Sequence, residues 1–98
     1  MRPEEYRNLI QDFLNGKFES ADAFARFYDK TFREDPDHFT DELFYILEDF
    51  FEDVEAYDPM WTLEDVNFFR ITEEMLKEEA VKAIEELDKY MQDRKNIG

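Results

Sequence analysis

Residues 40–58, TDELFYILEDFFEDVEAYD, decide the fold. Their apolar residues and their acidic residues both recur with the period of an α-helix. Helical spacing places an apolar set on one face, which we expect to pack in a core: Leu43, Leu47, Phe50, Phe51, Val54 and Tyr57. Asp41, Tyr45, Glu48 and Glu52 lie on the opposite face, with Asp49 to one side. Thr40 is a typical N-cap, and Asp58 followed by Pro59 predicts the end of the helix.

Three further segments have the apolar spacing of amphipathic helices, namely residues 3–15, residues 20–34 and a segment that begins at Thr72. Ser20 is an N-cap candidate, and Gly16 suits a helix C-terminus because it adopts a left-handed conformation at low cost. The inner face expected for the second segment consists of Phe24, Phe27, Tyr28 and Phe32. The inner stripe expected for the last consists of Leu76, Ala80, Ala83, Ile84, Leu87 and Met91.

No strand pattern and no internal repeat is present, so the sequence predicts an all-α fold. We expect an antiparallel four-helix bundle in which residues 1–98 form a single domain. The connection from Asp58 to Ile71 is long for such a bundle. We expect residues 62–65 to form one helical turn within it, and its aromatic residues to pack against the core: Trp61, Phe68 and Phe69.

The charge is concentrated in one part of the chain. Of the 27 acidic residues, thirteen lie between Glu34 and Phe69, whereas all 12 Lys and Arg residues lie outside this window. A net charge of −15 disfavours direct binding to nucleic acid and favours a basic protein partner. The N-terminus lacks the apolar core of a signal peptide, and no apolar run is long enough to span a membrane. We therefore expect a cytoplasmic protein without membrane contact.

The helix at residues 40–58 violates the charge rules that the other helices obey. Residues 20–34 and the last helix carry opposite charges at i,i+4 spacing, including Glu73–Lys77, Glu78–Lys82 and Glu85–Lys89. In contrast, Glu48–Glu52 and Asp49–Asp53 repel each other, by roughly 0.2–0.5 kcal/mol per pair. Repulsive charge pairs that no neighbouring residue offsets often mark a functional site. We therefore predict a partner-binding surface formed by the carboxylates Glu48, Asp49, Glu52 and Asp53 and the aromatic anchors Tyr45, Tyr57 and Trp61.

Catalytic and metal chemistry has little support in this sequence. The chain has no Cys, and His38 is its only histidine, so nucleophilic triads and carboxylate-bridged di-metal sites lack their ligands. Neither glycine fits a calcium-binding loop of the EF-hand type. We expect no enzyme activity, no cofactor and no metal. Two alternatives remain: an acidic chaperone or adaptor for a basic client, and a carboxylate-dependent hydrolase.

Three blocks of the sequence resemble the colicin D-type immunity proteins, a family that includes partners of bacteriocin and contact-dependent toxins. The blocks are residues 13–24 (FLNGKFESADAF), residues 41–44 (DELF) with the acids that follow to Tyr57, and residues 71–76 (ITEEML) leading to Val81 and Leu87. The stretch 59–70 does not closely match the family's pattern.

This resemblance implies an antiparallel four-helix bundle that binds a cognate ribonuclease toxin, in the family's type case one that cleaves tRNA. It also implies that carboxylates take the place of RNA phosphates in the toxin's basic active site. The positions that match the family's contacting acids are Glu48 and Asp53. The resemblance thus points to the same helix as the charge pattern.

Overall fold

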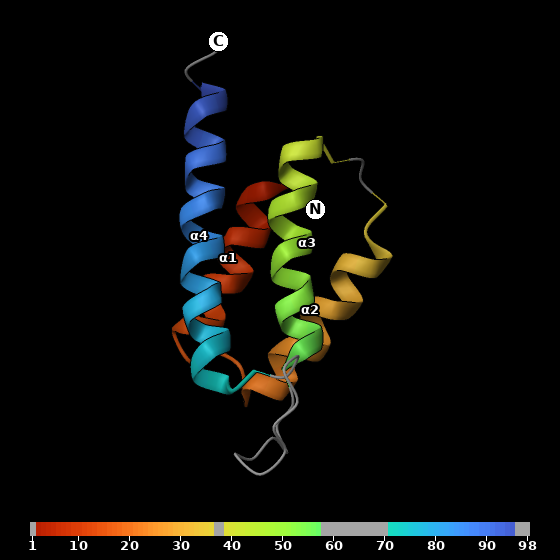
Figure 1. The fold of residues 1–98 in the computed structure, drawn as a ribbon, viewed down its shortest axis with the longest axis vertical. Coiled ribbons are helices and arrows are strands. Elements are labelled where there is room, and N and C mark those ends of the chain that lie inside the picture. Colours follow the sequence, from red (N-terminus) through yellow and green to blue (C-terminus); the bar gives the residue numbers. More distant parts are fainter. Residues whose placement is uncertain (1, 37–38, 58–70, 96–98) are drawn as a thin grey trace.

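Four helices make up the computed structural model of this chain, which describes residues 2–36, 39–57 and 71–95 (Figure 1). They are α1 (Pro3–Leu14), α2 (Ala21–Glu34), α3 (Asp41–Ala56) and α4 (Glu73–Lys95). Within these ranges there is no strand, and the single β-bridge joins Tyr57 to Ile71. The predicted all-helical class is confirmed. The antiparallel course of the helices and the single domain stay predictions.

Helices α2 and α3 begin directly after the N-caps that the sequence predicts, whereas α3 ends at Ala56, before the predicted stop at Asp58 and Pro59. The Ser20 hydroxyl accepts a hydrogen bond from the Ala23 N–H at 3.1 Å, and the Thr40 hydroxyl accepts one from the Leu43 N–H at 3.3 Å. After α1, Gly16 adopts a φ of 76°, a conformation that other residues rarely take. Local chemistry therefore sets the helix boundaries.

In Figure 1 the green helix α3 lies between α4 and α2, and it packs against both. Helix α4 also packs against α1. The side of α3 that faces these neighbours is buried and consists of Leu43, Ile46, Leu47, Phe50 and Val54. The core joins it to buried aromatic and aliphatic residues of the other helices, among them Tyr6, Ile10, Phe24, Tyr28, Leu76 and Leu87.

The predicted inner faces are correct except at their margins. Phe27 was expected to face the core, but this side chain is 52% exposed and contacts the ring of Phe18 on the outside of α2. Conversely, Ile46 and Tyr90 are buried although the apolar stripes did not include them. An apolar stripe shows which side of a helix faces the core. How many residues beside that stripe are also buried depends on how close the neighbouring helices lie.

Two hydrogen bonds from tyrosine hydroxyls hold α3 to its neighbours. Tyr28 of α2 donates to the backbone carbonyl of Leu47, at 3.0 Å and in a fully buried position. Tyr90 of α4 bonds to the hydroxyl of Thr40, the N-cap of α3, at 2.8 Å. On the other side of α4, Arg7 forms an ion pair with Asp88 at 2.8 Å. The two tyrosine contacts fix the position of α3 along the bundle, and the ion pair joins α1 to α4.

None of the four described helices is long and apolar enough to cross a lipid bilayer.

The buried tyrosine provides a test of this packing. Tyr28→Phe should lower the free energy of unfolding by about 1 kcal/mol, because it removes a buried hydrogen bond and leaves the ring in place. Tyr45→Phe is the matched control, since the Tyr45 side chain is 63% exposed, and it should change stability by less than about 0.5 kcal/mol. Urea denaturation measures both. Equal effects would show that the Tyr28–Leu47 bond does not hold α2 to α3.

Candidate partner-binding surface on α3

The outer side of α3 has three rows of residues, which differ in what lies next to them. One row, with Phe44, Phe51 and Glu55, lines a groove towards α2. A middle row points away from the bundle and consists of Asp41, Tyr45, Glu48 and Glu52. A third row, with Asp49 and Asp53, lies beside α4. The four predicted carboxylates therefore fall on two rows, with Glu48 and Glu52 in the middle and Asp49 and Asp53 towards α4.

Three basic residues from other helices lie close to the acids of α3, and one of them, Lys89 of α4, borders the same pocket as Glu42 and Asp49. Arg33 of α2 forms ion pairs with Asp29 on its own helix and with Glu55 on α3. Lys82 of α4 lies near Asp53, although its ion pair is with Glu79 at 3.2 Å. The sequence shows no basic residue near Glu55, but the fold supplies one. The local charge conflict of α3 is thus relieved at its C-terminal end on the side of α2.

No such partner reaches the middle row. Within the described ranges, Asp41, Glu48 and Glu52 form no ion pair with any Lys or Arg, and neither does Asp49 of the third row. Glu52 and Asp49 are exposed, and Glu48 is half-buried. The repulsion between Glu48 and Glu52 that the sequence predicts therefore remains uncompensated among the residues that the structure describes.

The α3–α4 boundary brings together carboxylates from both helices. Asp49 and Asp53 share this site with Glu79 and Glu86 of α4, and Lys82 lies among them. Partial burial raises the pKa of Asp53 to about 6, with further contributions from Glu79, Asp49 and Glu52. Partial burial also raises the pKa of Glu86, helped by Asp49 and Glu79. Such shifts mean that the negative charges are crowded together and would be stabilised by added positive charge.

The three predicted aromatic anchors have different surroundings. Tyr45 is 63% exposed on the middle row, as an anchor requires. Tyr57 is half-buried, packs against the core and forms the bridge with Ile71, so part of its ring has a structural role. Trp61 lies outside the described residues, as do the predicted turn at 62–65 and the aromatic residues Phe68 and Phe69. The prediction that Tyr45, Tyr57 and Trp61 contact a partner stays a prediction.

Sequence reasoning missed two parts of this surface. Glu79 and Glu86 were assigned no role, since helical periodicity does not tell which helix lies beside α3. The salt bridges expected along α4 also differ: Lys82 pairs with Glu79 rather than Glu78, and among the described residues Lys77 and Lys89 have no ion pair. The groove towards α2 was missed as well, because its aromatic rings come from three separate segments.

No group of three or more potential metal ligands is present within the described residues.

The crowding at Asp53 predicts a pH-dependent stability. Because its pKa is about 6 in the folded chain and 3.8 in the reference state, the folded chain binds this proton more tightly than the unfolded chain. The proton on Asp53 therefore contributes stability to the folded chain. This contribution is fully present below about pH 4 and is lost as the pH rises through 6. Asp53→Asn should stabilise the protein at pH 7.5 by about 1 kcal/mol, a value reduced for solvent screening, and by less at pH 4.

Glu52→Gln is the control, because Glu52 is exposed on the same helix and should show a change of less than about 0.5 kcal/mol at either pH. Urea denaturation at the two pH values measures the difference. If Asp53→Asn lowered the stability at pH 7.5, the ionised Asp53 carboxylate would not be unfavourable in the folded chain, and the prediction would be wrong.

Comparison with known proteins supplies a family for this chain. A family model described as bacterial self-protective colicin-like immunity matches residues 1–87. No curated protein and no solved structure matches the chain. The family match covers α1, α2 and α3 completely and most of α4. Members of this family are typically non-enzymatic inhibitors that bind a cognate toxin. The chain belongs to the colicin-like immunity family.

Proposed function

We propose that this protein is an immunity protein of the colicin D type that neutralises a ribonuclease toxin, and that α3 occupies the toxin's basic active site. The family supports the binding of a toxin. The uncompensated middle row of α3 is the observation that supports the choice of surface and of toxin class. Carboxylates held on a rigid helix present negative charge in an ordered array, as the phosphates of an RNA backbone do.

The roles of the carboxylates follow from their surroundings. Glu48, Asp49 and Glu52 have no ion pair in the described ranges, so a basic partner would meet their full charge. Asp53 is half-buried beside Glu79, and its raised pKa makes it a weaker phosphate mimic in the free protein. A lysine or arginine of the toxin would lower that pKa, so that binding near pH 6 would release a fraction of a proton. Tyr45 lies among these acids as an exposed aromatic anchor.

Antiparallel packing and a cytoplasmic location belong to this proposal. The course of the ribbon in Figure 1 supports the antiparallel arrangement, since the last turn of α3 and the first turn of α4 lie at the same end of the bundle. A cytoplasmic immunity protein would meet its toxin before the toxin reaches cellular RNA. No cofactor is needed for inhibition by occlusion.

Neutralising the exposed acids should weaken toxin binding. The triple variant Glu48→Gln, Asp49→Asn, Glu52→Gln should slow association with the toxin by about tenfold at low salt and reduce its salt dependence. The measurement is surface-based binding kinetics with the nuclease domain encoded beside the gene for this chain. A parallel assay of tRNA cleavage should show inhibition that is competitive with RNA.

A matched control changes the same number of charges elsewhere. Glu74, Glu78 and Glu85 are exposed on α4 and have no ion pair among the described residues, so replacing all three with Gln should alter association by less than about twofold. If both triple variants slowed association equally, only the net charge would matter, and the α3 surface would not be the binding site. If the toxin proved not to cleave RNA, the phosphate mimicry would be wrong.

A further inference from the structure

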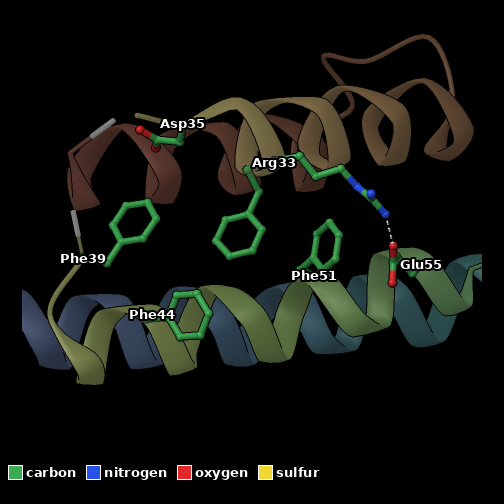
Figure 2. Close-up of a pocket in the computed structure, with 7 residues that line it drawn as sticks. Arg33, Asp35, Phe39, Phe44, Phe51 and Glu55 are labelled. Carbon is green, nitrogen blue, oxygen red and sulfur yellow. Dashed lines mark hydrogen bonds and ion pairs between the residues drawn. The ribbon is translucent and has the colours of Figure 1, made fainter. Parts of the chain in front are cut away.

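A groove between α2 and α3 exposes a group of aromatic rings. It has a volume of about 610 Å³. Figure 2 shows the rings of Phe39 and Phe51 in the space between the two helices, with the ring of Phe44 lying against α3. We call this the aromatic groove, and its lining consists of Phe32, Arg33, Asp35, Phe39, Phe44, Phe51 and Glu55.

The floor of the aromatic groove is continuous. The ring of Phe32 contacts Phe39, Phe44 and Phe51, with centroids 6.1, 6.2 and 5.1 Å apart. Although these rings touch one another, Phe44 remains 39% exposed. The core beneath is complete without this exposed surface, because Leu47 and Tyr28 are fully buried. A contiguous aromatic surface with a polar border is typical of a site that receives a side chain from another molecule.

The border of the aromatic groove is acidic. Among the described lining residues the one basic group is Arg33, which is bound by Asp29 at 2.8 Å and by Glu55 and covers the ring of Phe51 at 5.3 Å. Asp35 adds a carboxylate at the other end, where it accepts a hydrogen bond from Tyr6 at 2.6 Å. The groove also adjoins the middle row of α3, since Glu48 follows Phe44 by four residues and therefore lies on the same side of the helix.

We propose that the aromatic groove receives an apolar side chain of the toxin that is flanked by Lys or Arg residues, so that it is a second contact region beside the acidic surface; this inference rests on the proposed function. The charge of the border selects this occupant. A second copy of this chain would bring a further −15 to a negative surface. Nucleic acid and anionic lipid are repelled for the same reason.

The acidic surface of α3 and the aromatic groove affect different steps of binding. Carboxylates at the exposed middle row attract a basic partner over a distance and accelerate its association. A buried apolar side chain in the aromatic groove slows dissociation instead, because its water-excluded contacts must break before the partner leaves. Toxins with similar basic active sites but different apolar side chains would then be distinguished at the groove.

Phe44 and Phe27 form a matched pair for testing this proposal. Both are exposed phenylalanines on helix surfaces, at 39% and 52%, but Phe27 lies outside the aromatic groove and contacts Phe18. Phe44→Ala should raise the dissociation rate of the neighbouring-gene nuclease domain by about tenfold or more, and Phe27→Ala should change it by less than about twofold. Phe44→Lys and Phe27→Lys form a second pair, and both keep a long side chain. Phe44→Lys adds a positive charge inside the groove, where it would repel the partner's Lys or Arg, whereas Phe27→Lys adds the same charge outside the groove.

The proposal is overturned if the wild-type protein binds the nuclease domain and both Phe44 variants bind within twofold of it; the immunity function would then stand without the groove. Failure of the wild-type protein to bind would refute the proposed function itself. Capped peptides KKFKK and KKAKK decide the groove in that case. Amide NMR signals of Phe44 and Phe51 should shift with the first peptide and not with the second, whereas equal shifts would refute an apolar subsite.

Discussion

The burial of one side of α3 between α2 and α4 is the constraint on which the rest of the structure depends. Leu47 and Phe50 are almost completely removed from water, and the hydroxyl of Tyr28 bonds directly to the backbone of α3. This packing fixes the rotation of α3 about its own axis. Every acid that does not fit the buried side is therefore forced to one of the three outer rows, and the position of each follows from helical geometry.

The electrostatics follow from that rotation. Glu55 is brought to Arg33, whereas Glu48 and Glu52 form no ion pair with any basic residue that the structure describes. Asp53 is pressed against Glu79, and burial beside like charges raises its pKa. The same rotation that completes the core thus creates a helix whose charges are satisfied on one flank, crowded on the other and unopposed between them. Charge conflicts of this kind are expected at functional sites.

The parts of the fold that could be predicted are those that local chemistry controls. Ser20 and Thr40 mark helix starts by hydrogen bonds within a few residues, so their positions were readable from the sequence. Apolar spacing predicted Leu47 and Leu87 as core residues for the same reason. What could not be predicted depends on which helices are neighbours. Phe27 is as apolar as Phe24, and only the packing leaves it outside; Glu79 and Arg33 join the α3 surface from other helices.

The bridge between Tyr57 and Ile71 joins the end of α3 to the start of α4 through the backbone. The N–H of Ile71 donates to the carbonyl of Ala56 at 3.0 Å, so the chain leaves α3 and enters α4 at adjacent points. Because this contact is made by backbone atoms, it holds the end of α3 beside the start of α4 whatever side chains stand at these positions.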